Sequence, residues 1–269
     1  MRDRGLTLAA LGLMCLVFSR PAWAEPPDPA SAVPPGSAAT FLGDWICFYA
    51  GFDQATVHPD LAAGDAEPRL LYGSLQFEAG ILGHSLRVGA GGAEVGFATP
   101  RNLELAKPGA LSMWVMPRTW KDTGSAYLPL IRIFGAGQAV FVIERDVRSA
   151  GEGERDRIIT GPSGLSGGRQ VLMFRPLPGR WRNGEWHLLA LDWDAMGFAL
   201  SIDGAPFVRE AAPGGTLPHT FQANASPQGF VIGNRGQEAT LMDELVVYQR
   251  PLTDEEAVQL FSRPKTIKR

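Results

Sequence analysis

Cysteine is scarce in this chain: its 269 residues include only two, Cys15 and Cys47. Cys15 lies in an apolar N-terminal run that we expect to be removed on export, which leaves Cys47 without a partner in the chain. Disulfide bonds therefore cannot hold this fold together, as they do in many small secreted domains. The fold must depend on a hydrophobic core.

The chain also lacks an excess of basic residues. It carries 25 Lys and Arg residues against 28 Asp and Glu, a formal net charge of −3. Without residues 1–24 the balance is 22 against 27, a net charge of −5. Because nucleic-acid binding depends on a basic surface, this composition argues against a nucleic-acid partner.

Long hydrophobic runs are absent except at the N-terminus. There, two basic residues precede an apolar run from Gly5 to Phe18, and small residues, Ala22 and Ala24, occupy the positions that determine cleavage. The run is too short for a typical transmembrane helix, so we predict a signal peptide at residues 1–24. A retained membrane anchor is the alternative. We expect an exported protein in the periplasm, at the cell surface or outside the cell, with no membrane span after cleavage.

Sequence signatures of cofactor sites are missing as well. The four histidines, His58, His84, His187 and His219, are not spaced as zinc ligands are, and Cys47 has no neighbouring cysteine. No glycine-rich nucleotide-binding motif follows a strand pattern. Neither a transition metal nor a nucleotide cofactor is predicted.

The remaining sequence divides into three segments. Residues 25–40 are rich in Pro, Ala and Ser, which is the composition of a flexible linker. Residues 41–263 alternate short apolar runs with Gly and Pro turns, and residues 264–269 form a basic tail. With 45% hydrophobic residues, the chain can bury one large core, so we predict a single folded domain.

The periodicity of residues 41–263 predicts an all-β fold. No stretch before the C-terminal helix keeps a helical period for three turns, and turn residues separate the apolar runs. We predict two antiparallel sheets packed as a sandwich. The expected strands are 45–52, 74–77, 85–88, 94–97, 110–116, 127–134, 139–144, 170–175, 186–193, 198–202, 229–232 and 240–248.

The last strand and the helix after it are the most informative stretch. A period of two places Asp243 on the same face as Leu245 and Val247. A carboxylate buried among aliphatic side chains needs a cation or several hydrogen bonds. Thr253 then precedes Glu256 by three residues, a capping box that predicts the start of a short C-terminal helix.

Several segments resemble laminin G-like domains of the concanavalin A-like jelly-roll type. They are the closing strand and helix, a Trp-His pair at Trp186 and His187, an Asp-Gly turn at Asp203 and Gly204, and the runs 83–88, 94–97 and 111–117. The resemblance covers roughly residues 48–261. It implies a two-sheet jelly roll with a short C-terminal helix.

The resemblance also implies one structural Ca²⁺ between the end of the first strand and the last strand, where Asp53 and Asp243 stand. Ca²⁺ takes about six to eight oxygen ligands, and carbonyl groups of glycine-rich loops would complete the set. The alternative is that Asp53 is a turn residue and Asp243 a hydrogen-bonded core carboxylate.

The resemblance extends to glycoside hydrolases, which use paired carboxylates on one strand. The runs Glu144-Arg145-Asp146 and Glu154-Arg155-Asp156 begin such a pattern, but neither is followed by the closing Glu. We interpret both runs as charged, solvated loop. Because no complete catalytic dyad or triad is present, we predict no enzymatic activity, with a polysaccharide hydrolase or lyase as the alternative.

A binding surface is the remaining candidate for function. The segment from Glu144 to Trp186 is longer than a hairpin loop and rich in Gly and Arg. Sugar rings stack on exposed aromatic side chains while nearby polar groups fix their orientation. The candidate ligand-binding residues are Trp181, Arg180, Asn183, Trp120 and Tyr127. The alternative is that Trp120 and Trp181 pack over the edge of the sandwich.

Together these features predict an exported, non-catalytic, monomeric binding module with a carbohydrate-recognition or surface-adhesion role. Its partner would be a glycan or an extracellular or surface protein, and a structural, adhesive protein-binding domain is the alternative within this class. The assignment follows from the fold, which carries lectins, adhesion modules and enzymes alike.

Overall fold

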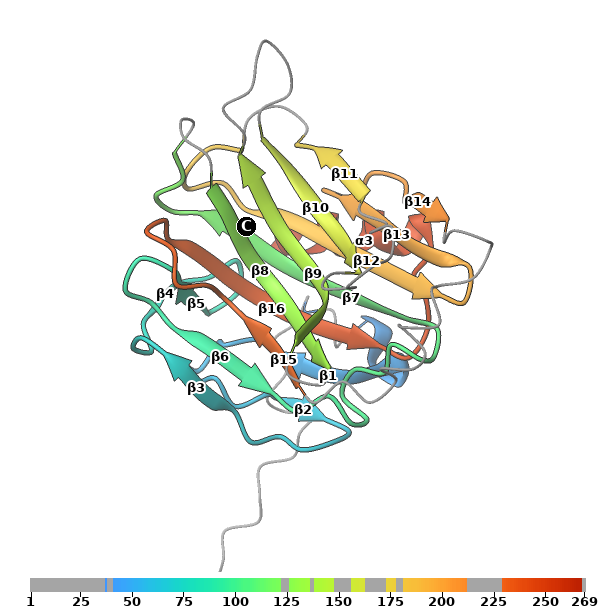
Figure 1. The fold of residues 1–269 in the computed structure, drawn as a ribbon, viewed down its shortest axis with the longest axis horizontal. Helices are drawn as coiled ribbons and strands as arrows, with labels where there is room; N and C mark the ends of the chain where they lie inside the picture. The colour runs from blue at the N-terminus through green and yellow to red at the C-terminus, as the bar shows by residue number, and fades with distance from the viewer. Residues whose placement is uncertain are drawn as a thin grey trace, which may run out of the picture.

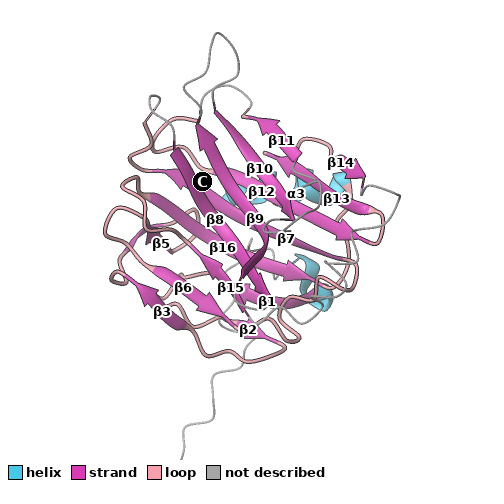
Figure 2. Ribbon diagram, viewed as in Figure 1, coloured by secondary structure: helices cyan, strands magenta, loops and turns pink. Residues whose placement is uncertain are grey.

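The computed structural model describes residues 37, 41–121, 126–135, 138–147, 156–162, 173–177, 181–211 and 229–267. These residues form two antiparallel β-sheets packed face to face, with helix α3 against the outer face of one sheet (Figures 1 and 2). The predicted all-β sandwich with a C-terminal helix is confirmed. Within the described residues, no helix is both long and apolar enough to cross a membrane.

The central strand of the first sheet, sheet A, is β16, which pairs with β7, β1 and β5. β5 (His84–Val88) also pairs with β4 (Phe77–Ala79). The order of the other strands is β14 (Val208–Ala211), β13 (Gly197–Ile202), β12 (His187–Asp194), β7 (Gly109–Pro117), β16 (Thr240–Tyr248), β1 (Ile46–Ala50) and β2 (Leu61–Ala62).

The second sheet, sheet B, faces the viewer in Figure 1. Its order is β11 (Met173–Pro176), β10 (Asp156–Pro162), β9 (Gln138–Val147), β8 (Ala126–Gly135), β15 (Gly229–Ile232), β6 (Glu94–Phe97) and β3 (Arg69–Tyr72). The strands β2 and β3 are edge strands of the two sheets. They lie at the same side of the sandwich (Figure 1).

The main core lies between the two sheets and includes side chains from both. Phe48 of β1 meets Phe97 of β6 and Phe230 of β15 edge to face, at ring-centroid distances of 5.0 and 5.1 Å. Aromatic pairs in this geometry stabilise a core beyond the area that they bury. Phe48, Phe97 and Phe230 therefore join the two layers directly.

The outer face of sheet A is also buried. The residues before β1, which include η2 (Gly43–Trp45), and helix α3 (Asp254–Ile267) supply a second apolar cluster against it. Phe261 of α3 stacks on Trp114 of β7 at 5.7 Å. The strands β7 and β16 are consequently apolar on both faces, which explains their nearly continuous hydrophobic sequence.

The predicted capping box at the start of α3 is confirmed. The Thr253 amide donates to Glu256 Oε2 at 2.9 Å, and the Glu256 amide donates to Thr253 Oγ1 at 3.2 Å. Arg250 holds the same Glu256 carboxylate with two guanidinium nitrogens. Helix α3 continues to Ile267, so it includes the first residues of the segment predicted as a tail.

Several strands were not predicted from the sequence: β2, β3, β10 and β14. The segment from Glu144 to Trp186 is not one long loop, because it contains the end of β9 together with β10 and β11. These strands are short or begin with charged residues. Their sequences therefore lack the apolar alternation on which the prediction depended.

We predict that Gly109→Ala destabilises the sandwich. A Cβ atom at Gly109 would lie 2.6 Å from Trp193 Cζ2, and overpacking of this kind costs about 1–3 kcal/mol. Chemical denaturation should show a lower midpoint with an unchanged slope. Gly43→Ala is the matched control because a Cβ atom there meets nothing within 4 Å. Equal stabilities of the two variants would contradict this packing.

Candidate binding site

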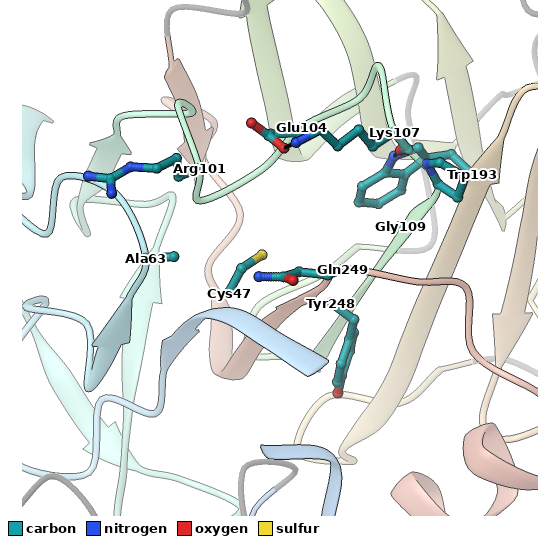
Figure 3. A pocket seen from close by; sticks show the side chains of 10 residues that line it. Cys47, Ala63, Arg101, Glu104, Lys107, Gly109, Trp193, Tyr248 and Gln249 are labelled. Carbon is teal, nitrogen blue, oxygen red and sulfur yellow. Dashed lines mark hydrogen bonds and ion pairs between the residues drawn. The ribbon is translucent and has the colours of Figure 1, made fainter. Parts of the chain in front are cut away.

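A cavity of about 360 Å³ opens at one end of sheet A (Figure 3). It lies where β1 and β7 begin and where β12 and β16 end, beside the loop 98–108 that joins β6 to β7. Residues from segments far apart in the sequence line it, among them Cys47, Glu104, Lys107, Gly109, Trp193 and Gln249. Concave sites of this kind are where folded domains hold small ligands.

One end of the cavity is lined by Trp193 of β12 (Figure 3). Its indole nitrogen donates to the Lys107 carbonyl at 2.8 Å, which fixes the ring beside Gly109. Trp193 is 1% exposed, so it presents little of its ring to solvent. It supplies a rigid wall, and a side chain at position 109 would displace it.

The loop 98–108 is held in place by buried leucines and by the hydrogen bonds of Asn102. Leu103 and Leu105 are buried in the main core. Asn102 is fully buried, and its side chain donates to the Asp65 carbonyl at 2.7 Å and accepts from the Gly64 amide at 2.6 Å. The loop is therefore attached to the segment after β2, and the cavity wall that it forms is preorganised.

Polar side chains line several sides of the cavity. Lys107 Nζ and Glu104 Oε2 form an ion pair at 2.5 Å on one wall, and the Gln249 amide lies on the opposite side (Figure 3). The side chain of Lys107 is 72% exposed, so this pair is open to solvent and to a ligand. Arg101 and Ala63 lie at the end away from Trp193 (Figure 3).

Cys47 contributes a protonated thiol to the cavity. Its Sγ lies 3.3 Å from the Asn102 carbonyl oxygen and 3.5 Å from that of Val247. Burial raises the pKa of the Cys47 thiol to about 11. Because the thiolate is the reactive form, Cys47 is a poor nucleophile at neutral pH. The cavity thus offers groups for hydrogen bonding and packing around a ligand.

The opposite ends of β7, β12 and β16 are closed by a stack of planar side chains. Arg145 lies over Trp120 at 4.1 Å, Trp120 stacks on Trp181 at 5.9 Å, and Trp181 stacks on His187 at 4.1 Å. Trp120 and Trp181 are only 6% and 4% exposed. The expectation that these rings present free faces to a sugar is therefore wrong, and they pack over the edge of the sandwich instead.

Of the other predicted ligand-binding residues, the structure describes the side chain of Asn183 alone. The exposed Asn183 clamps the backbone of Trp120, because its Oδ1 accepts from the amide at 2.9 Å and its Nδ2 donates to the carbonyl at 3.2 Å. Tyr127 stands in β8 opposite Asp146, and its side chain lies outside the described residues. Arg180 also lies outside the described residues.

The interpretation of Glu144-Arg145-Asp146 as solvated loop is wrong. These residues belong to β9, and Arg145 and Asp146 are buried. Arg145 donates to Glu238 Oε2 at 2.8 Å and to the Lys121 carbonyl at 3.0 Å. Arg157 of β10 donates twice to Asp146 Oδ2, at 2.9 and 2.7 Å. Partners from other strands make this burial tolerable, and the local sequence does not reveal them.

In the second run, Asp156 begins β10 and not a loop, whereas Glu154 and Arg155 lie outside the described residues. The pairing with β9 begins at this residue, since Asp156 stands opposite Val147. The expectation of a charged loop is therefore wrong at Asp156. Because β10 begins with polar residues, the search for alternating apolar residues did not detect this strand.

A β-bulge in β16 changes the predicted orientation of Asp243. The register with β7 shifts between Asp243 and Val246, and Glu244 adopts a positive φ of 50°. Leu245 and Val247 face the main core, whereas Asp243 contacts the turn 80–83 and its neighbour Val246 belongs to the outer cluster. The predicted sharing of one face by Asp243, Leu245 and Val247 is wrong.

Backbone amides hold the buried carboxylate of Asp243. Oδ2 accepts from Ile81 at 2.8 Å and from Leu82 at 3.3 Å, and Oδ1 accepts from Glu244 at 2.8 Å. Burial, followed by the charges of Glu244 and Asp53, nevertheless raises the pKa of Asp243 well above its ordinary value. The hydrogen bonds fasten β16 to the turn 80–83 in front of β5.

Asp53 lies at the other side of the same turn. Its Oδ1 is buried without a hydrogen-bond partner, in close contact with the backbone of Gly83, where φ is positive and a Cβ atom would collide with the carboxylate. Burial raises the pKa of Asp53 to about 6, Asp60 adds to this rise, and His84 opposes it. The sequence did not identify Asp60, whose carboxylate accepts from the Gly51 amide at 2.8 Å.

Asp53 and Asp243 fit a Ca²⁺ site in part. Asp53 supplies an unpartnered carboxylate oxygen, and Asp243 Oδ1 accepts a hydrogen bond from the Glu244 amide. However, no group of three or more His, Cys, Asp or Glu side chains in the described residues is arranged to hold a metal. An ion here would therefore need backbone carbonyls and water as its other ligands.

The chain matches no protein-family profile and no curated protein sequence. Its fold is similar to those of solved structures. Domain 4 of AbnA, a GH43 extracellular arabinanase from Geobacillus stearothermophilus, solved with arabinotriose, superposes with a TM-score of 0.54 at 17% identity. The match covers 80% of this chain and 98% of that domain.

Two binding domains of larger size are also similar in fold. The binding domain of Paraclostridial Mosquitocidal Protein 1 matches with a TM-score of 0.60, 12% identity and coverage of 81% of this chain and 52% of the other. The ligand-binding domain of botulinum neurotoxin serotype D, solved with N-acetylneuraminic acid, matches with a TM-score of 0.60 and 11% identity. That match covers 84% of this chain and 52% of the other. The chain thus spans about half the length of these two binding domains. The TM-scores show a shared fold.

We predict that Asp53→Asn stabilises the protein at pH 7.5 in the presence of a chelator. A folded-state pKa of about 6, above the ordinary 3.8, means that native Asp53 holds its proton longer than the unfolded chain does. Its contribution to stability is therefore fully present below pH about 4 and is lost as the pH rises through 6. Melting curves should show a higher Tm for the variant at pH 7.5 and converge toward pH 4.

Asp44→Asn is the charge-matched control, because it removes an exposed carboxylate elsewhere. It should shift the melting temperature little across this range. If Asp53→Asn were less stable than the unchanged chain at pH 7.5, without calcium, the burial of an uncompensated charge at Asp53 would be refuted.

Proposed function

We propose that this chain is an exported, non-catalytic binding module that holds a carbohydrate in the cavity beside Trp193. The supporting observation is the set of groups around that cavity: the Glu104 carboxylate, the Lys107 ammonium and the Gln249 amide. Sugar hydroxyls donate and accept hydrogen bonds, and these groups together offer both functions. The preorganised loop and the fixed indole reduce the entropy lost on binding.

The structural neighbours support this proposal by analogy of fold. The arabinanase domain was solved with arabinotriose, and the botulinum neurotoxin domain with N-acetylneuraminic acid. The match with the arabinanase domain covers nearly the whole of that domain. Folds of this type carry unrelated functions, so the argument depends on the cavity itself. Assignment to the laminin G-like group, and a location outside the cytoplasm, belong to the same proposal.

A structural Ca²⁺ at Asp53 and Asp243 is a second part of the proposal. The unpartnered Asp53 oxygen and the raised pKa values of both carboxylates mark a place where a cation would relieve repulsion. The ion would fasten the turn 80–83 between β1 and β16. It would act on stability, because the cavity lies at the other end of β16.

We predict that Gln249→Ala weakens binding of a sugar and that Ala63→Trp abolishes it. Loss of one amide hydrogen bond should raise Kd about 2–10-fold, whereas a tryptophan at Ala63 would fill the mouth of the cavity. A glycan array should be followed by calorimetry, with arabinotriose and N-acetylneuraminic acid included as soluble probes.

Arg182→Ala is the control, because Arg182 is exposed at the opposite end of the strands, beside the aromatic stack. It should bind as the unchanged chain does. The proposal fails if no glycan binds, or if Arg182→Ala weakens binding while Gln249→Ala and Ala63→Trp do not.

We further predict that Ca²⁺ raises the Tm of the unchanged chain and that a chelator lowers it. Asp53→Asn should respond less, because it removes a ligand and a negative charge, and Asp44→Asn should respond fully. Differential scanning calorimetry with Ca²⁺, Mg²⁺ and chelator measures this. A Tm that does not change between Ca²⁺ and chelator rules out the metal.

A further inference from the structure

The charged side chains around the cavity do not balance. Among the described residues that line it, Arg101 and Lys107 carry positive charge and Glu104 alone carries negative charge. Lys107 is paired with Glu104, so those two groups are neutral together. The lining is therefore positive by one charge, although the whole chain has a formal net charge of −3.

Arg101 is the cation that no carboxylate neutralises. Within the part of the chain that the structure describes, its guanidinium forms no ion pair and no hydrogen bond. The side chain is exposed and extends away from Trp193, at the far end of the cavity (Figure 3). A guanidinium presents its N–H donors in a planar fork that matches the oxygens of a carboxylate or a sulfate. An anionic group of a ligand would find these donors unoccupied.

The backbone of Arg101 is strained, which a solvated surface arginine does not require. Its φ is 66°, in the left-handed region that favours glycine. The Asn102 amide donates to the Thr99 carbonyl at 2.9 Å, so residues 99–102 form a tight turn with Pro100 second and Arg101 third. This is the pattern of a type II turn, whose third position is usually glycine. Strained residues of this kind are concentrated at functional sites.

The buried side chain of Asn102 holds this turn in place. It accepts from the Gly64 amide at 2.6 Å and donates to the carbonyls of Asp65 and Ala98 at 2.7 and 3.0 Å. The backbone position of Arg101 is therefore set before a ligand arrives. Only the flexible side chain must become ordered on binding, which limits the entropy lost.

Glu104 determines where in the cavity an anionic group can lie. Burial raises the pKa of the Cys47 thiol to about 11, and the charge of Glu104 adds to this rise, so the Glu104 charge acts on the cavity wall. A second anion beside Glu104 would be repelled. The anionic group must then lie at Arg101, while neutral hydroxyls lie between Glu104 and the Gln249 amide, beside the wall at Trp193.

We propose that the cavity selects sugars that carry one anionic group, a carboxylate or a sulfate ester, and that Arg101 recognises this group. This specificity rests on the proposed function, since it names the class of carbohydrate that the same cavity takes. A guanidinium stays charged at every pH at which the protein folds. The preference therefore follows the charge of the sugar.

An array that pairs each charged sugar with a neutral counterpart tests the preference. The pairs are glucuronic acid with glucose, N-acetylneuraminic acid with its methyl ester, and glucose 6-sulfate with glucose. We expect a charged sugar to bind about tenfold more tightly than its counterpart, as measured by calorimetry. The ratio should fall as salt is added, because the contact is exposed. The pair with the largest ratio identifies a carboxylate or a sulfate as the group recognised.

Arg101→Gln tests the residue, because it removes the charge and keeps a long polar side chain. It should abolish the tenfold preference and leave the weaker binding of the neutral sugar unchanged. Arg182→Gln is the matched control, since Arg182 is an exposed arginine at the opposite end of the strands. Arg101→Gly should also lose the preference while its Tm stays equal or rises, because glycine relieves the left-handed backbone.

Three outcomes refute the specificity. If sugars bind and each neutral counterpart binds as tightly as its charged partner, Arg101 recognises no anion, although the carbohydrate site itself stands. If Arg101→Gln and Arg182→Gln reduce the preference equally, the effect comes from the general charge of the chain. If no sugar of either kind binds, the proposed function fails and the specificity fails with it.

Discussion

The β-bulge at Glu244 is the constraint on which the arrangement of sheet A depends. Because β16 is the central strand, its register fixes which side chains face β7, β1 and β5. The bulge turns Leu245 and Val247 toward the main core and leaves Asp243 against the turn 80–83. Three backbone amides hold the Asp243 carboxylate there. A buried acid that would be costly alone thus becomes the link between the central strand and the turn before β5.

The two ends of β7, β12 and β16 differ in how their side chains pack. At one end, Arg145 and three aromatic rings fill the space between the sheets, and Asn183 fastens the neighbouring backbone. At the other end, Gly109 has no side chain, so Trp193 can turn beside it and leave a cavity lined by loop 98–108. The filled end supplies rigidity and the open end supplies room. This division explains why Trp120 and Trp181 at the filled end present no accessible ring face.

The sequence was sufficient for the fold because alternation, turn residues and the capping box at Thr253 each depend on neighbours along the chain. It was insufficient for the site because the deciding partners are distant. Period two cannot reveal a bulge, so the face of Asp243 was predicted incorrectly. Trp181 is buried through contacts with His187 and Trp120, which the fold alone brings near. The cavity lining has no local pattern, since it joins Cys47, the loop 98–108 and the end of β16.

Asn102 connects the proposed ligand site with the segment that follows β2. Its carbonyl oxygen lies 3.3 Å from Cys47 Sγ in the cavity wall, and its side chain bonds the backbone of Gly64 and Asp65 just before β3. The amide nitrogen also donates to the Ala98 carbonyl at 3.0 Å at the start of the loop. A ligand that stabilises this loop therefore also restrains the segment that leads into the edge strand.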